Sequence, residues 1–373
     1  MGGGGGRGRM AAPGRSAGSR GVTALQRAQE LCEYCPKMCR FACPVSEAAR
    51  REALTPWAKV SLAALSAREP DASAALAFAG CTGCDRCAHH CAHDNDVKGI
   101  LFAARATAVR AGVAPRPCTE LALRFSARGH GETTDLAAVR RSLPEARGEA
   151  VLFAGCEALA RGGQDVRDTL LVAERLGAPL TLAPEAALCC GRKLLEGGHP
   201  ELHEAHGVRV RGSLVRARRP VHLVFLDPGC AADVRERWAL PERSRVEHVT
   251  TYLARLLVAM PEEDRPPPLQ ETFAFHDPCA LARELRETIA PRALLAAAVS
   301  DVREPARCGV DTSCCGASGL LPRTMPDIAQ RIAEDRRAEL GGPAVTSSPA
   351  CASALGATEV VSVLARWLAQ GTR

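Results

Sequence analysis

Short apolar runs and helix-length amphipathic stretches alternate along the chain after residue 150. The runs 150–154 and 272–276 predict buried strands, because each is short, almost continuously apolar and followed by a turn. The stretches 165–176 and 288–299 follow them and have the length and pattern of helices. Since alternating strands and helices are typical of βαβ units, this pattern predicts parallel sheets.

The chain before residue 150 has a different pattern. Residues 22–125 are rich in Ala, Leu and Arg, and the apolar stretch 97–109 has the length of a helix, which predicts an all-α domain. The consecutive prolines of residues 261–271 predict an extended linker. The expected multi-domain organisation is a disordered tail (1–21), a helical domain (22–125), a linker (126–149), an α/β domain (150–260), a Pro-rich linker (261–271) and a second α/β domain (272–373).

The two predicted α/β domains repeat one arrangement of cysteines. Each has a Cys after its first strand, then a Cys-Cys-Gly triplet, and then a Cys near the end of a later strand. Equivalent positions are separated by 123, 125 and 121 residues (Cys156 to Cys279, Cys190 to Cys315, and Cys230 to Cys351). Because ligands of parallel sheets bind beyond the carboxyl ends of strands, we expect a site there in each domain.

Cysteine is the unusual component, with 18 Cys among 373 residues. No apolar stretch reaches the about 18 residues of a membrane span, and the tail has no apolar core of a secretory signal. These features indicate a cytoplasmic protein, and peripheral association with the inner face of the cytoplasmic membrane stays open. In a reducing compartment, abundant Cys are more often metal ligands than disulfides. Without a basic stripe, the net charge of +6 does not indicate nucleic-acid binding.

Eight cysteines between residues 32 and 91 form two runs. The second run has the spacing C-x2-C-x2-C-x3-C of bacterial ferredoxins, and the first has one extra residue after its second Cys. In such runs the fourth Cys binds the other cluster. The expected ligands are therefore Cys32, Cys35, Cys39 and Cys91 for cluster one, and Cys81, Cys84, Cys87 and Cys43 for cluster two. Zinc also binds CxxC pairs, but two four-Cys runs fit two [4Fe–4S] clusters better.

Two ferredoxin-type runs followed by two Cys-Cys-Gly blocks resemble the CCG-domain iron–sulfur subunits. This family includes subunits of heterodisulfide reductase, glycolate oxidase and anaerobic glycerol-3-phosphate dehydrogenase. The resemblance spans about residues 25–370 and implies an all-α ferredoxin-type domain followed by two tandem α/β CCG domains. The family's block ends in Cys-x-x-Cys, whereas Asp227 and Ser348 replace the first Cys of that pair here.

The resemblance also implies the ligands of the two CCG sites. Site one would use Cys156, Cys189, Cys190 and Cys230, with Asp227 as a candidate fifth ligand. Site two would use Cys279, Cys314, Cys315 and Cys351, with Ser348 or His276 as a further candidate. The two remaining cysteines, Cys118 and Cys308, are interpreted as ordinary buried thiols.

In function, the resemblance implies an electron-transfer subunit of an oxidoreductase complex. It would relay electrons between a flavoprotein dehydrogenase partner and a quinone or thiol acceptor, using two [4Fe–4S] clusters and further iron–sulfur clusters or zinc at the CCG sites. No dinucleotide fingerprint or P-loop is found, so we expect no flavin or NAD site on this chain. One alternative is a heterodisulfide or disulfide reductase with catalysis at a CCG-bound cluster. Another is a zinc-binding scaffold or thiol redox sensor.

Overall fold

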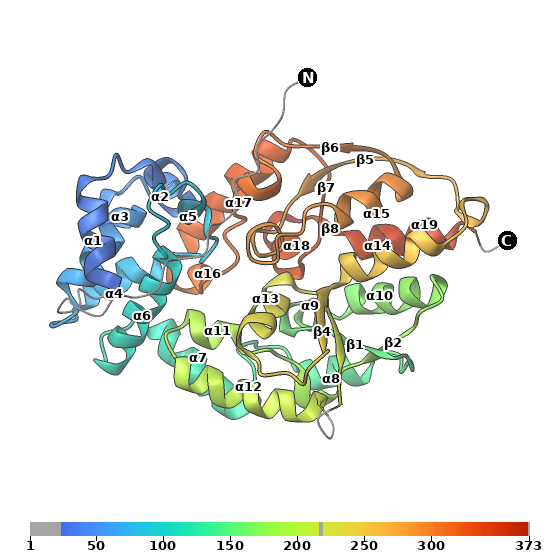
Figure 1. Cartoon of the computed structure of the whole chain (residues 1–373), viewed down its shortest axis with the longest axis horizontal. Helices are drawn as coiled ribbons and strands as arrows, with labels where there is room; N and C mark the ends of the chain where they lie inside the picture. The colour runs from blue at the N-terminus through green and yellow to red at the C-terminus, as the bar shows by residue number, and fades with distance from the viewer. Residues whose placement is uncertain (1–23, 216–218, 372–373) are drawn as a thin grey trace.

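The chain folds into a helical part and two α/β domains (Figure 1). The structure is a computed structural model that describes residues 24–215 and 219–371. The predicted tail at 1–21 lies outside the described residues. In Figure 1 the helices of residues 24–110 occupy one end of the molecule, and the two α/β domains lie side by side at the other.

All the regular elements that the structure describes before β1 are helices. Several begin at residues suited to a helix N-terminus: Pro44 and Pro56 occupy first turns, and the Asp71 and Asp96 side chains accept hydrogen bonds from first-turn N–H groups. Their apolar faces meet around Val60, Phe78 and Leu101. The helices are α1 (Ala24–Tyr34), α2 (Pro44–Ala49), α3 (Pro56–Leu65), α4 (Ala72–Ala79), α5 (Arg86–His89), α6 (Val97–Arg110), α7 (Arg116–Arg128) and α8 (Leu136–Arg141), with short 3-10 turns η1 (Met38–Phe41) and η2 (Glu52–Leu54).

The first α/β domain contains a four-stranded parallel sheet of order β2-β1-β3-β4. The strand β1, which lies inside the sheet, is apolar and largely buried, and its Leu152 and Phe153 belong to two different core clusters. The strands are β1 (Ala150–Phe153), β2 (Leu180–Leu182), β3 (His222–Phe225) and β4 (Arg245–His248). The helices are α9 (Cys156–Ala160), α10 (Gln164–Arg175), α11 (Arg192–Glu196), α12 (Pro200–Leu214), α13 (Pro228–Arg237) and α14 (Val249–Ala259).

The second α/β domain repeats this topology. Its parallel sheet has the order β6-β5-β7-β8, so its second, first, third and fourth strands lie in the same sequence as those of the first domain. The strands are β5 (Leu269–His276), β6 (Val299–Arg303), β7 (Ala344–Thr346) and β8 (Thr358–Glu359). The helices are α15 (Ala290–Ala298), α16 (Leu321–Thr324), α17 (Pro326–Leu340), α18 (Pro349–Leu355) and α19 (Val360–Ala369), with a π-helical turn η5 (Ala280–Glu284) after β5. The parallel α/β character predicted from the sequence is confirmed.

One hydrophobic core joins the two α/β domains. Helix α10 packs against α19 and α14 against α15, so a layer of helices lies between the two sheets. The same core cluster contains Leu152 and Val172 of the first domain and Leu294 and Trp367 of the second. The two domains are therefore held in a fixed relation, although a Pro-rich segment joins them in the sequence.

Both segments expected to be linkers contribute to this packing. The segment 126–149 contains α8, whose Leu136 is fully buried in the shared core. The segment 261–271 ends inside β5, and its Pro266 carbonyl accepts a hydrogen bond from Trp367 Nε1 at 3.0 Å. These contacts lie between residues distant in sequence, which explains why the local pattern resembled a linker.

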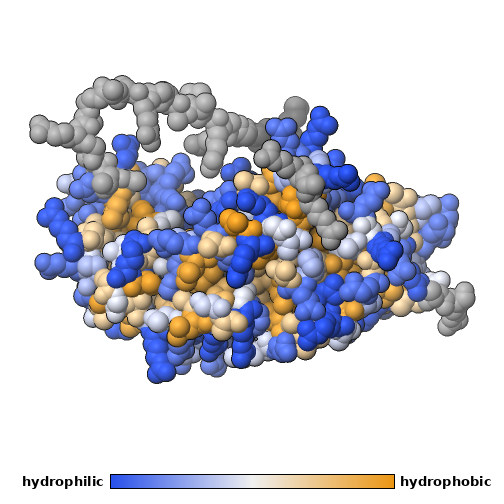
Figure 2. Space-filling model, turned by 90° about the horizontal axis from the view of Figure 1, so that it is seen from below, coloured by the Kyte–Doolittle hydropathy of each residue, from blue (hydrophilic) through white to orange (hydrophobic). Residues whose placement is uncertain are grey.

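The part of the chain that the structure describes contains no candidate membrane-spanning helix. None of its helices has both the length and the apolar character needed to cross a bilayer. On the face seen in Figure 2, hydrophobic residues are interspersed with hydrophilic ones.

Candidate functional site

The thiols of Cys32, Cys35, Cys39 and Cys91 lie together in the helical part. Cys32 is near the end of α1, Cys39 is on η1, and Cys91 follows α5. Burial raises the pKa of Cys39 to about 11, and the other three thiols add to that rise. Lys37 has a left-handed φ of 59° and donates its N–H to Cys35 Sγ at 3.4 Å, so the backbone turns around this group.

The thiols of Cys43, Cys81, Cys84 and Cys87 line one small buried cavity. Burial raises the pKa of Cys87 well above its usual value, and the charges of the other three thiols raise it further. Gly83 donates its N–H to Cys81 Sγ at 3.4 Å. Each group thus takes three thiols from one run and the fourth from the other, which is the arrangement that two cubane clusters need. That each group holds a cluster stays a prediction.

Lys59 places a positive charge beside the second group. Its side chain is 1% exposed, lines the same cavity, and donates from Nζ to the Gly80 carbonyl at 2.6 Å. The ammonium lowers the pKa of Cys43, opposing the larger effect of burial. A buried lysine is costly unless a negative group compensates it, so this lysine fits a site that carries negative charge.

Each CCG block brings four thiols to the carboxyl ends of its strands. In the first domain, Cys156 follows β1 and Cys230 lies in the first turn of α13, directly after β3. The Sγ atoms of Cys190 and Cys230 are 3.1 Å apart, too far for a disulfide, whose S–S distance is about 2.05 Å. Hydrogen bonds from Cys189 and Cys230 hold the pKa of Cys190 well below its usual value.

The second block has the same geometry. The Sγ atoms of Cys315 and Cys351 are 3.2 Å apart, and hydrogen bonds from Cys314 and Cys351 hold the pKa of Cys315 well below its usual value. The second Cys of each triplet is therefore the favoured thiolate in both domains. Such convergent thiols fit an iron–sulfur cluster or zinc, because both bind thiolates.

The glycine of each triplet is needed for its backbone conformation. Gly191 has φ +92°, and a Cβ there would lie 2.7 Å from Cδ2 of His206. Gly316 has φ +84°, and a Cβ there would lie 2.9 Å from the carbonyl oxygen of Ala329. Both positions therefore exclude larger residues while the chain turns at the site.

The two CCG sites open into one cavity of about 540 Å³ between the domains. Cys156, Cys190 and Cys230 line it from one side, and Cys279, Cys315 and Cys351 line it from the other. Thr82 and Gly83 of the helical part also reach it. All three parts of the chain therefore meet at this cavity.

Asp227 and Ser348, which replace the two missing cysteines, contact each other across the domain boundary. Ser348 Oγ donates to Asp227 Oδ2 at 3.1 Å, and Asp227 Oδ1 accepts from the N–H of Cys230 at 3.1 Å, capping α13. Burial raises the pKa of Asp227 to about 6. Each carboxylate oxygen thus accepts one hydrogen bond, and Asp227 stays a candidate fifth ligand beside the four thiols of site one.

The second four-Cys group contacts CCG site two directly. A hydrogen bond from Cys314 lowers the pKa of Cys84 well below its usual value, and Cys314 Sγ lies 3.5 Å from Thr82 Oγ1. Arg283 donates from Nε to the Cys84 carbonyl at 2.6 Å. These contacts bring the ferredoxin-type run and the second CCG block together.

Arg105 fastens the helical part to both α/β domains. It is 4% exposed and donates to five carbonyl groups of all three parts, those of Phe78, Ala79, Cys81, Glu196 and Gly319. Neither Arg105 nor Lys59 was predicted from the sequence. For Arg105, the available signal was its charge inside the largely apolar helical stretch 97–109.

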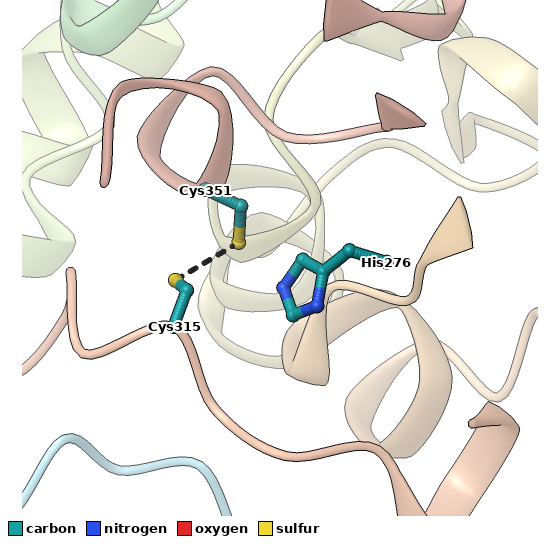
Figure 3. A group of neighbouring side chains, drawn as sticks. All are labelled: His276, Cys315 and Cys351. Carbon is teal, nitrogen blue, oxygen red and sulfur yellow. Dashed lines mark hydrogen bonds between the residues drawn. The ribbon is translucent and has the colours of Figure 1, made fainter. Parts of the chain in front are cut away.

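His276, Cys118 and Cys308 complete the set of candidate residues. His276 lies beside Cys315 and Cys351, and one ligand atom from each of the three falls within 4.8 Å of the others (Figure 3). Cys118 is buried at 3% exposure, as predicted. Cys308 is only partly buried, because it lies on the loop after β6.

Comparison with known proteins agrees with this geometry. The family model described as "Cysteine-rich domain" (CCG) matches residues 150–235 and 273–356. The chain is 27% identical over 273 residues to a subunit of the dihydromethanophenazine:CoB--CoM heterodisulfide reductase of Methanosarcina barkeri, covering 69% of this chain and 66% of the relative. The subunit of the same name from Methanosarcina acetivorans is 26% identical over 274 residues, with the same coverage.

A shorter match links the chain to a bacterial protein. "Lactate utilization protein A" of Shouchella clausii is 28% identical over 184 residues, covering 46% of this chain and 72% of the relative. The chain spans 66% of the length of the heterodisulfide reductase subunits that it matches. The two matches and the repeated topology show that the chain contains two CCG cysteine-rich domains, and these relatives are consistent with the CCG iron–sulfur family.

Proposed function

We propose that the chain is an iron–sulfur electron-transfer subunit of an oxidoreductase complex. It relays electrons between a flavoprotein dehydrogenase partner and a quinone or thiol acceptor, and it works in the cytoplasm or on the inner face of the cytoplasmic membrane. The observation that carries this proposal is the packing of residues 82–84 against the second CCG block, where Cys314 Sγ lies 3.5 Å from Thr82 Oγ1 and Arg283 Nε donates to the Cys84 carbonyl at 2.6 Å. These contacts join the ferredoxin-type part to the CCG sites. When bound, iron–sulfur clusters would supply the one-electron redox chemistry.

The residues of this chain would hold and balance these groups. Cys32, Cys35, Cys39 and Cys91 would hold one [4Fe–4S] cluster, and Cys43, Cys81, Cys84 and Cys87 the other. Lys59 would offset negative charge at the second cluster, since its ammonium is buried beside the four thiols. The four thiols of each CCG site would hold a further cluster.

The shared cavity between the two CCG sites is a suitable binding site for the electron acceptor. Its volume of about 540 Å³ lies in the usual range for small-molecule sites, about 300–1,000 Å³. Lys193 lines it and bridges Glu132, at 2.5 Å, and Glu157. A small acceptor there would contact both CCG sites.

An exposed apolar patch next to the first four-Cys group fits the place where a partner delivers electrons. Tyr34, Met38 and Phe41 are 87%, 56% and 71% exposed. Each lies within two residues of Cys35 or Cys39 in the sequence. Exposed apolar residues grouped in this way are typical of protein interfaces.

A second candidate function is disulfide reduction at the CCG sites. The cavity between two thiol sites favours it, and so do the names of two relatives. The replacement of a Cys by Asp227 and by Ser348 in the two blocks opposes it.

The relay is tested by metal analysis of anaerobically purified variants. We expect Cys35→Ser, Cys81→Ser, Cys156→Ser and Cys279→Ser each to lose iron from one site. Cys118→Ser is the matched control, because Cys118 is a buried thiol outside all four sites, and it should keep the full iron content. Equal iron in all five variants would refute the assignment of the four sites.

Electron paramagnetic resonance (EPR) of the oxidised protein separates the two functions. A relay gives the same spectrum with and without an added thiol substrate. A reductase gives a thiol-dependent signal, which Cys190→Ser should abolish if the chemistry occurs at site one.

A further inference from the structure

His276 is a fully buried histidine at the edge of CCG site two. It is the last residue of β5, and its side chain points between Cys315 and Cys351 (Figure 3). The Nε2 atom faces these sulfurs and has no hydrogen-bond partner among the described residues. The Nδ1 atom accepts a hydrogen bond from Arg336 Nε at 3.0 Å.

Arg336 fixes the tautomer of this histidine. An arginine guanidinium keeps its protons in proteins, so its Nε–H must act as the donor. The side chain is 1% exposed and is held by the carbonyl of Arg307 at 3.0 Å and by Glu339 at 2.7 Å. Because Nδ1 accepts this bond, the single proton of the neutral imidazole resides on Nε2. A ring whose Nδ1 accepts a hydrogen bond is not the doubly protonated imidazolium, so the ring is neutral.

We infer that His276 donates an Nε2–H hydrogen bond to the Cys315 thiolate and is not a metal ligand. A neutral histidine that binds a metal through Nε2 carries its proton on Nδ1 and donates it to an acceptor. Arg336 offers no acceptor at that position. This inference rests on the proposed function only in that a metal group occupies site two.

The first CCG site lacks this donor. Phe153 stands three residues before Cys156, as His276 stands three residues before Cys279, and it packs on Phe225 at a centroid distance of 5.0 Å. Hydrogen bonds to sulfur ligands are among the features that set the potential of an iron–sulfur site, and they stabilise the more negative reduced state. His276 therefore raises the reduction potential of site two, and the two similar sites become unequal.

The test uses the full chain purified anaerobically, and it compares wild type with two variants. His276→Phe introduces the residue that the first site already has at this position. His276→Gln keeps an N–H donor near the sulfur. We expect all three proteins to contain the same iron, the site-two potential of His276→Phe to become more negative, and that of His276→Gln to stay near wild type. An unchanged potential in His276→Phe would overturn the inference.

A spectroscopic measurement on the wild type needs no substitution. Pulsed EPR should show no coupling to a directly coordinated imidazole nitrogen at site two, and finding such a coupling would overturn the inference. If site two contained zinc in place of iron, the proposed function would be refuted at this site, but the role of His276 could still be measured. X-ray absorption would then show either sulfur neighbours alone, as we expect, or an imidazole shell, which would contradict us.

Discussion

Replacing Arg105 with methionine should weaken the attachment of the helical part to both α/β domains. Its guanidinium donates five hydrogen bonds to carbonyl groups, at distances from 2.6 to 3.3 Å. A hydrogen bond to a charged group contributes about 1.5–3 kcal/mol, but the sum is offset by the cost of burying the charge. Arg105→Met leaves five buried carbonyl groups without this donor, at a cost of about 1–3 kcal/mol for each that finds no other partner; offset by the charge that is no longer buried, the net loss is about 3–5 kcal/mol. We therefore expect Arg105→Met to lower the free energy of unfolding by that amount.

The assay is urea unfolding under anaerobic conditions. With an m-value of about 3 kcal/mol per M, the midpoint should fall by about 1–2 M. Arg110→Met is the matched control, since Arg110 lies on the same helix and makes one ion pair with Glu201, with side chains 60% and 75% exposed. Exposed pairs contribute about 0–1 kcal/mol. If the two variants had the same midpoint, the role given to Arg105 would be wrong.

Three further predictions concern the sites and the pH dependence. Lys59→Met should make the potential of the second four-Cys site more negative, because a buried positive charge is lost; an unchanged redox titration would contradict this. Cys91→Ser should remove the same EPR signal as Cys35→Ser, since the two thiols belong to the first four-Cys group. If Cys91→Ser instead removed the signal of the second four-Cys group, the assignment of the fourth thiol to the opposite run would be wrong. Burial lowers the pKa of His248 from 6.5 to about 4, so the unfolded chain binds more protons between these values. Stability should therefore fall by up to about 3 kcal/mol as the pH drops from 6.5 to 4, and His248→Gln should remove that slope in acid unfolding.

Local patterns in the sequence were enough to predict much of the fold. The predicted strand 150–154 is β1 (Ala150–Phe153), and the predicted helix 165–176 is α10 (Gln164–Arg175). In both, the pattern of apolar residues is clear within the segment itself, because β1 is continuously apolar and α10 spans several helical turns. The two-residue strand β8 shows no such period. Helix α8 was missed because its six residues form barely more than one turn, and its stability comes from burying Leu136.

The candidate site could be predicted only as far as spacing constrains it. Cysteine spacing predicted the two ferredoxin-type sets of thiols, and the family resemblance implied the two CCG sets; the structure brings the members of each set close together. The contact of Thr82 with Cys314 joins residues 232 apart, and that of Asp227 with Ser348 joins residues 121 apart. Such contacts depend on how the parts dock, and docking depends on buried residues such as Arg105. The docking of the three parts therefore could not be predicted from local sequence patterns.

The central claim is that this chain binds iron–sulfur clusters. Its most direct test is iron, sulfide and zinc analysis of the anaerobically purified full chain, with EPR after reduction by dithionite. We predict a brown protein with about eight or more iron atoms per chain, since two cubane clusters alone need that number. A colourless protein that contains only zinc and gives no EPR signal on reduction would contradict the claim.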